Sequence, residues 1–316
     1  MMRKIVLTSI AIVVILTFFV EVGLAEPAKS KKKAGGKNIP VSNATAEADQ
    51  QMTDFSLAGY GEKGAKSWDL SGENADIFDN VVRLSNVTGN LYGDEQIKLT
   101  ADKGDFDKIE GKVHLEDNVI IATSAGTKMT TDSLDWDRKN EVVSTDDPVN
   151  ISRNNMITTA MGVVGQPSLN KVTLGKDVEV NILPSPEGSS SPGIKDKIVI
   201  TCDGPLEIDY QNNVAVFKNN VKVDAEDRQI YSDIMEVYFI SGQHEQAPAA
   251  DAAANPMAGS RIDRIVSRGN VKIVSGENVS YSDEAVYTAV NKKIVLSGKP
   301  RLVIQATGEG NAPFGN

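Results

Sequence analysis

The chain has 316 residues, of which 24% are charged and 40% hydrophobic, and its formal net charge is −10. This composition is typical of a soluble globular protein of about two domains, and it excludes a polytopic membrane protein and a wholly disordered chain. The negative charge argues against a nucleic-acid partner, because proteins that bind phosphate backbones need a concentrated positive field.

Cysteine and histidine are too scarce for several kinds of site. The single cysteine, Cys202, excludes an intramolecular disulfide and a zinc site built on cysteines. The two histidines, His114 and His244, belong to no metal-binding or hydrolase motif, and the sequence contains no glycine-rich phosphate-binding loop. We therefore expect no cofactor, no metal site, no catalytic residue and no enzymatic activity.

The N-terminal residues have the pattern of an export signal. A short basic stretch, Met1 to Lys4, precedes a mostly apolar run from Ile5 to Val20, and Gly23-Leu24-Ala25 resembles a signal-peptidase site. The apolar run is slightly short for a membrane span, and lysines on both sides leave its orientation open. Residues 1–25 are thus interpreted either as a signal peptide that is removed or as a helical membrane anchor that is retained.

Composition divides the rest of the chain into two structured regions. Turn-forming residues without apolar periodicity mark a linker between them, and an alanine-rich, low-complexity stretch interrupts the second region. We predict a flexible tether at 26–54, a first β-domain at 55–183, a linker at 184–196, a second β-domain at 197–305 with an insertion at 241–260, and a disordered tail at 306–316.

Alternation of apolar and polar residues predicts strands throughout both regions. Val178-Glu179-Val180, Val221-Lys222-Val223 and Val271-Lys272-Ile273 alternate with period two, as expected for antiparallel strands with one buried and one solvated face. No amphipathic helical pattern of 11 or more residues follows residue 25. The sequence therefore predicts an almost entirely β protein.

A small unit recurs, in which Asn or Asp precedes valine at the start of an apolar–polar alternation. Asn and Asp tolerate the left-handed backbone of a tight turn, and valine favours the strand that follows, so we interpret each unit as a turn leading into a strand. Tyr231-Ser232-Asp233 and Tyr281-Ser282-Asp283 follow two of these units at the same interval, which indicates one hairpin design used repeatedly. The unit occurs at Asn118-Val119, Asp177-Val178, Asn220-Val221, Asn270-Val271 and Asn278-Val279.

The order of several short motifs resembles two protein families of lipopolysaccharide export. Residues from about 66 to 182 resemble LptC, the membrane-anchored component, and residues from about 197 to 305 resemble LptA, the soluble bridge protein. The first resemblance rests on Trp68-Asp69-Leu70, Leu99-Thr100-Ala101-Asp102-Lys103-Gly104, Asp117-Asn118-Val119, Leu134-Asp135-Trp136, Pro148-Val149 and Ile157-Thr158-Thr159-Ala160-Met161-Gly162. The second rests on Ala215-Val216-Phe217, Asn219-Asn220-Val221-Lys222-Val223, Ile230-Tyr231-Ser232-Asp233, Gly269-Asn270-Val271 and Leu296-Ser297-Gly298-Lys299-Pro300.

This resemblance implies a fold, a ligand and a location. The fold would be two twisted antiparallel β-jelly rolls of the OstA-like type, which join edge to edge into a continuous groove. Acyl chains of lipopolysaccharide would lie in the apolar interior, with other Lpt components (the inner-membrane permeases and the outer-membrane translocon) paired at the edge strands. The protein would be periplasmic and held in the inner membrane by residues 5–25. The insertion at 241–260 departs from the family pattern, and the chain ends soon after Pro300-Arg301-Leu302-Val303.

The candidate lipid contacts are the inward-facing residues of the repeated strands. The alternative interpretation is that these side chains form an ordinary core, and in an open jelly roll one residue can do both. The candidates are Val119, Ile121, Leu134, Trp136, Val221, Val223, Val237, Phe239, Val271 and Ile273.

Other single residues have simpler interpretations. Strand parity places His114 on the solvated face, and Cys202 follows an apolar strand, which predicts a buried structural thiol. Trp68 and Trp136 are expected to anchor the core. The recurring aspartates (Asp132, Asp233 and Asp283) are expected to make hydrogen bonds at turns or strand ends.

Three functions compete. The first is the lipid-transport bridge described above. The second is a structural or adhesive envelope protein built from β-hairpins, which would bind no lipid. The third is a polysaccharide-processing β enzyme, which would need convergent carboxylates, and nothing in the spacing of the acidic residues points to such a pair.

Overall fold

The computed structural model describes residues 48–61, 64–93, 96–124, 126–137, 139–166, 169–184, 197–240 and 261–304. In these residues the chain forms strands and no α-helix, which confirms the predicted all-β jelly-roll fold. The predicted N-terminal helix, the tether up to residue 47, residues 185–196 of the linker, the insertion at 241–260 and the tail at 306–316 lie outside the described residues.

Seventeen strands follow one another in chain order. We call β1–β9 the first half and β10–β17 the second half. The first half contains β1 (Gln50–Tyr60), β2 (Lys66–Ile77), β3 (Val81–Leu91), β4 (Ile97–Asp107), β5 (Lys112–Thr123), β6 (Lys128–Asp137), β7 (Val142–Arg153), β8 (Met156–Gln166) and β9 (Lys171–Ile182). The second half contains β10 (Ile198–Cys202), β11 (Leu206–Asp209), β12 (Val214–Ala225), β13 (Arg228–Ile240), β14 (Arg261–Ser275), β15 (Asn278–Thr288), β16 (Lys293–Ser297) and β17 (Arg301–Val303).

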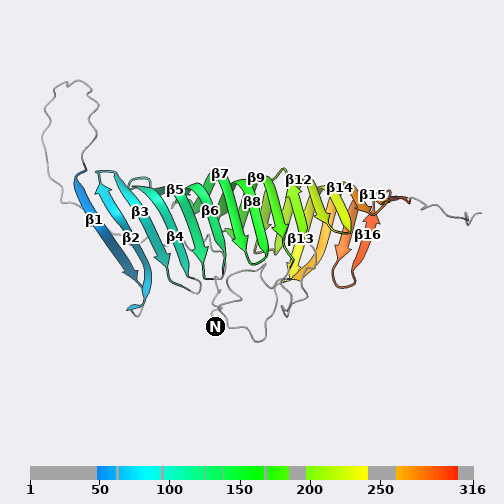
Figure 1. The fold of residues 1–316 in the computed structure, drawn as a ribbon, viewed down its shortest axis with the longest axis horizontal. Helices are drawn as coiled ribbons and strands as arrows, with labels where there is room; N and C mark the ends of the chain where they lie inside the picture. Colours follow the sequence, from blue (N-terminus) through cyan, green and yellow to red (C-terminus); the bar gives the residue numbers. More distant parts are fainter. Residues whose placement is uncertain are drawn as a thin grey trace, which may run out of the picture.

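The strands form one row, in which each long strand pairs antiparallel with the next (Figure 1). At the junction between the halves, β9 pairs with both β10 and β11, and these two short strands pair in turn with β12. Hydrogen bonding therefore continues without a break past the predicted linker. The first strand begins at Gln50, so the prediction that residues 50–54 belong to a flexible tether is wrong, while the other domain boundaries stay predictions.

The long strands bend at bulges in the middle of the strand. The strand register shifts at Asp117-Asn118 in β5, at Asn219-Asn220 in β12 and at Gly269-Asn270 in β14. Both residues of each pair have a positive φ, between 49° and 75°. In each case the two left-handed residues lie opposite one residue of the next strand, so the bulge adds one residue to its strand and bends the sheet locally. The expected left-handed backbone is confirmed at Asn118, Asp177, Asn220 and Asn270, but these four residues lie inside strands and not in turns. Asn278 begins β15 directly after a turn, as expected, but its φ is not positive.

The asparagine of each bulge is tied to an acidic side chain on the preceding part of the sheet. Asn118 Nδ2 donates to Asp102 Oδ2 at 2.6 Å, and Asn270 Nδ2 donates to Asp233 Oδ2 at 2.9 Å. Asn220 makes the same bond to Asp203. Asp233 thus makes a hydrogen bond as expected, although it lies within β13 and not at a strand end. The repeated Asp and Asn residues of the sequence therefore fix the bend from one strand to the next.

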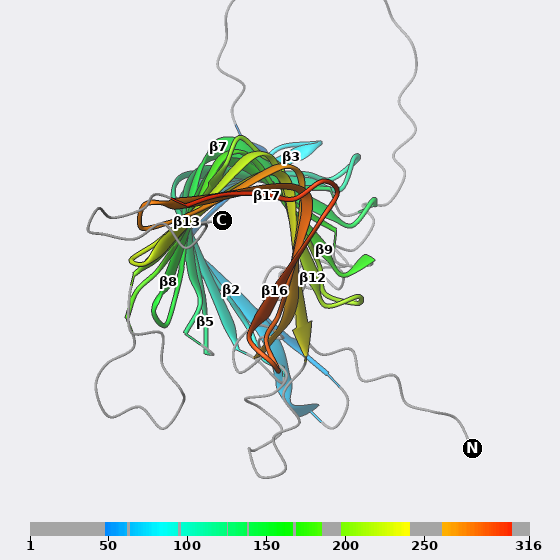
Figure 2. The same cartoon turned by 90° about the vertical axis from the view of Figure 1, so that its right-hand side faces the viewer.

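Apolar side chains occupy the inside of the bend. Viewed along the row, the strands curve around a common axis (Figure 2), and alternate residues of each strand point toward it. Trp68 and Trp136 are both buried, which confirms them as core anchors. At the outer edge of the first half, Phe55 of β1 lies directly opposite Gly72 of β2, where an added Cβ would come within 2.7 Å of the phenyl ring. The glycine therefore makes room for the aromatic ring that holds the edge strand.

We expect substitution of a bulge glycine to destabilise the fold more than substitution of a hairpin glycine. Gly269 and Gly276 both have a positive φ, so alanine at either costs about 1 kcal/mol in backbone strain. A Cβ at Gly269 would also press on the Asp233 side chain that accepts from Asn270, whereas a Cβ at Gly276 meets nothing within 4 Å. Gly269→Ala should therefore lower the free energy of unfolding by about 3 kcal/mol.

Urea denaturation of both variants measures this difference. Equal losses for Gly269→Ala and its control Gly276→Ala would mean that the contact between the bulge and Asp233 contributes nothing beyond backbone strain.

Candidate functional site

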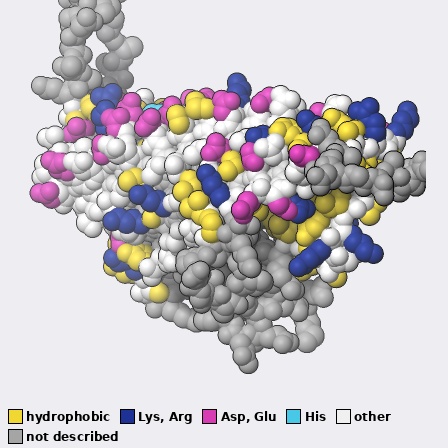
Figure 3. Space-filling view, turned by 45° about the vertical axis from the view of Figure 1, so that its right-hand side comes forward, with side chains coloured by type: hydrophobic (Ala, Val, Ile, Leu, Met, Phe, Trp, Pro, Cys, Tyr) yellow, Lys and Arg dark blue, Asp and Glu magenta, His cyan; other side chains and the backbone are white. Residues whose placement is uncertain are grey.

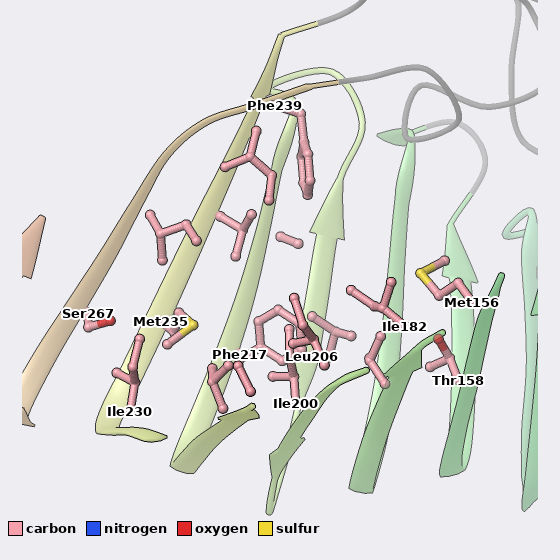
Figure 4. A pocket seen from close by; sticks show the side chains of 18 of the residues that line it. Met156, Thr158, Ile182, Ile200, Leu206, Phe217, Ile230, Met235, Phe239 and Ser267 are labelled. Carbon is pink, nitrogen blue, oxygen red and sulfur yellow. The ribbon is translucent and has the colours of Figure 1, made fainter. Parts of the chain in front are cut away.

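A cavity of about 570 Å³ lies inside the curve of the sheet, from β7 to β16 (Figure 4). Strand parity explains its apolar walls, because the residues that alternate with the solvated ones on each strand all point inward. Its walls include Ile151, Met156, Val172, Leu174, Val180 and Ile182 of the first half and Ile198, Ile200, Leu206, Ile208, Phe217, Ile230, Met235 and Ile265 of the second.

The polar lining of the cavity gathers at strand ends. Thr127 precedes β6, Arg153 ends β7, and Arg228 begins β13. Arg153 Nη1 donates to Thr127 Oγ1 at 3.2 Å, and Arg228 forms an ion pair with Asp227. Glu226 and Asp227 offset the two arginines in number, so the lining carries no excess of one charge.

Tyr210, which directly follows β11, also lines the cavity. Burial raises the pKa of Tyr210 to about 12, against the smaller opposing effect of the Arg153 charge. The phenol is therefore neutral at physiological pH and presents a ring and a hydroxyl group rather than an anion. The cavity as a whole can bury hydrocarbon, at roughly 0.8 kcal/mol for each methylene group.

Four of the predicted lipid contacts line this cavity. Val223, Val237, Phe239 and Ile273 point into it from β12, β13 and β14. Val221 and Val271 directly follow their bulges and precede Val223 and Ile273 by two positions. Each of the two is only 1% exposed. These last two side chains are packed core in the present structure, and lipid contact by any of the six stays a prediction.

The four candidates of the first half lie in a much tighter interior. Val119, Ile121, Leu134 and Trp136 are all buried. Leu134 and Trp136 border a void of only about 40 Å³, which is far smaller than the cavity of about 570 Å³ described above. The structure does not bring these four residues together with the other candidates, and their burial favours their interpretation as core.

Ten lining residues of β8–β11 were not expected from the sequence, namely Thr158, Val172, Leu174, Ile208 and six others. The alternation at Val178-Glu179-Val180 continues to Ile182 and resumes at Ile198-Val199-Ile200, so the signal for inward-facing residues was present. These side chains line one cavity only because β9 pairs with β10 and β11 across the linker, and no local sequence pattern reveals that pairing. The six others are Met156, Val180, Ile182, Ile198, Ile200 and Leu206.

His114 and Cys202 do not line the cavity. His114 is on the solvated face, as expected, with Nδ1 2.7 Å from Asp135 Oδ1. Cys202 is 4% exposed, which confirms a buried thiol, and burial raises the pKa of that thiol. In the part of the chain that the structure describes, no group of three or more His, Cys, Asp or Glu side chains is placed to hold a metal ion.

Comparison with known proteins identifies both halves of the chain. The family model described as "Lipopolysaccharide-assembly, LptC-related" matches residues 10–182, and the model described as "LptA/(LptD N-terminal domain) LPS transport protein" matches residues 204–313. These matches confirm the resemblance and its order. No curated protein shows a significant match. Because the first model covers more than half of the 316 residues, the chain belongs to the LptC-related lipopolysaccharide-assembly family, and a segment of the LptA/LptD N-terminal type follows in the same chain.

Proposed function

We propose that this protein is a periplasmic bridge segment that carries lipopolysaccharide from the inner to the outer membrane, with the lipid A acyl chains in its apolar groove. The two families matched by the chain act in lipopolysaccharide transport and are not enzymes. The observation that carries the proposal is the cavity of about 570 Å³ whose walls are almost entirely apolar.

The chemistry of the cavity suits the acyl chains better than the phosphates of lipid A. The chain has a net charge of −10, so bulk charge repels an anionic lipid. Burial of hydrocarbon does not depend on that charge. The lining also offers balanced charges at the strand ends rather than a cluster of cations. Hydrophobic burial is therefore the term that would hold the lipid, while its sugars stay in water.

The two ends of the row supply surfaces for strand addition. Of the described strands, β1 pairs with β2 alone, and β16 and β17 pair with β15 alone. Val295, Leu302 and Ile304 are between 59% and 68% exposed at the second end. Hydrophobic side chains gather toward this end in Figure 3. Unblocked apolar edges invite pairing with another strand, so other Lpt components are the proposed partners.

The charge of the edge formed by β16 and β17 favours partners of opposite charge. Between residues 261 and 304 the sequence has eight Lys and Arg residues and four Asp and Glu residues, although the whole chain is acidic. Lys293 and Arg301 lie on the edge strands β16 and β17. A partner with an acidic edge strand would complement this end.

Attachment to the inner membrane is proposed for residues 5–25. The apolar run there follows two basic residues, and LptC-like proteins keep such an anchor. These residues lie outside the described part of the chain. Within that part, no helix has the length and hydropathy needed to cross a membrane.

Photocrosslinking in cells tests the transport function. A photoreactive side chain at Val223, which lines the cavity, should form an adduct with lipopolysaccharide, and one at the outward-facing neighbour Lys222 should not. The tightly packed Trp136 should give a weaker adduct than Val223, because the void beside it is small. If an exported and folded protein gave no lipid adduct at any inward position, the structural or adhesive function would replace this proposal.

Charges placed on the second edge should weaken partner binding. The double substitution Leu302→Asp with Ile304→Asp puts carboxylates where an apolar strand would pair, and should reduce co-purification of the outer-membrane translocon by about tenfold, equivalent to ~1.4 kcal/mol. Val290→Asp is the matched control, because Val290 is 87% exposed but lies in the connection between β15 and β16. Equal binding by both variants would exclude this edge as the docking surface.

A further inference from the structure

The wall of the cavity contains the junction between the two halves, which we call the seam. It consists of β9 on one side and β10 with β11 on the other. Nine cross-strand pairs span it. Four of these pairs place both of their side chains in the cavity lining. The four pairs are Ile182 with Ile198, Val180 with Ile200, Leu174 with Leu206 and Val172 with Ile208.

The inward side chains of the seam border the empty volume of the cavity. All eight are aliphatic, and Ile182, Ile198, Ile200 and Ile208 are only partly buried. The void beside Trp136 in the first half has a volume of about 40 Å³, whereas the cavity at the seam has a volume of about 570 Å³. Side chains that border an empty volume lose the dispersion contacts that a filled core would provide. A ligand in the cavity would restore those contacts on both sides of the seam at once.

The size of the cavity limits what can fill it without movement of the walls. A group the size of a water molecule or a methylene takes up roughly 30 Å³, so the volume holds about twenty such groups. This volume has room for at least one saturated acyl chain. The polar side chains at the strand ends, including Thr127, Arg153 and Tyr210, provide a place for the polar end of such a chain.

We propose that the seam cavity is a discrete binding site for a single acyl chain, built jointly by the two halves, and that its occupation holds the halves together. This inference rests on the proposed function, of which it specifies one site. A ligand that contacts both walls binds only when β9 is docked on β10 and β11, so by linkage its binding stabilises that docking. The lipid would then be both the cargo and part of the joint between the LptC-like and LptA-like segments.

The test uses the full chain with a recognition sequence for a site-specific protease inserted between Ser189 and Ser190. Parinaric acid, a fatty acid that fluoresces in apolar surroundings, serves as the single-chain probe. After cleavage, the urea midpoint at which the halves separate is measured by size-exclusion chromatography, with and without the probe. We expect one probe molecule per chain and a higher midpoint when it is bound.

Two variants of one wall residue separate the site from simple misfolding. Ile200→Glu places a carboxylate in the wall and should abolish both probe binding and the midpoint shift. Ile200→Phe adds volume to the empty space, so it should weaken probe binding by about tenfold and yet raise the midpoint of the probe-free protein. Lys222→Gln on the outward face is the control, because it removes only a solvent-accessible ion pair with Asp224, and it should change neither probe binding nor the midpoint shift that the probe causes.

The outcomes are distinct from those of the transport function. The inference is overturned if the probe does not bind, if it binds without moving the midpoint, or if Ile200→Phe lowers the midpoint and leaves binding intact. A lipopolysaccharide adduct at Val223 together with any of these results would leave the transport function standing. Normal probe binding and midpoint shift without any lipopolysaccharide adduct would instead support the seam site and overturn the transport function.

Discussion

The bend in the middle of the strands is the constraint on which the rest of the structure depends. A flat sheet of these strands would leave its apolar face exposed to water. The left-handed pairs at Asp117-Asn118, Asn219-Asn220 and Gly269-Asn270 fold that face inward, and the bonds from asparagine to aspartate hold the bend at each step. The interior then becomes a space shared by many strands, and its contents depend only on the size of the inward side chains.

That dependence explains why the two halves differ while the backbone pattern is the same. In the first half, buried side chains that include Leu134 and Trp136 leave a void of only about 40 Å³. At the seam, shorter aliphatic side chains leave a cavity large enough for an acyl chain. A transport function therefore places the resting lipid in the second half and at the seam, and requires side chains of the first half to move for lipid to pass.

Much of the fold could be predicted from the sequence, because period-two alternation and the recurring Asn-Val units are local signals. Local signals are also the reason why most of those units were wrongly interpreted as turns. A left-handed asparagine such as Asn118 has the same sequence signature in a hairpin and in a bulge. Val223 and Phe239 could be placed on the inner face by parity alone, and they line the cavity. Trp136 has the same parity but lies in a filled interior, since packing depends on residues from several other strands. The contribution of Ile182 and Ile200 required knowledge that the sheet continues past the linker.

The order of strand pairing has a consequence for how the chain reaches this structure. Among the described strands, extensive contacts join only strands that are neighbours or next neighbours in sequence. The fold therefore has few contacts between distant parts of the chain, and its topology is nearly one-dimensional. Each new hairpin can add to an edge that already exists, without waiting for the C-terminal residues. A chain that emerges from its N-terminal end can thus fold progressively, and each new edge is exposed to aggregation until the next strand pairs with it.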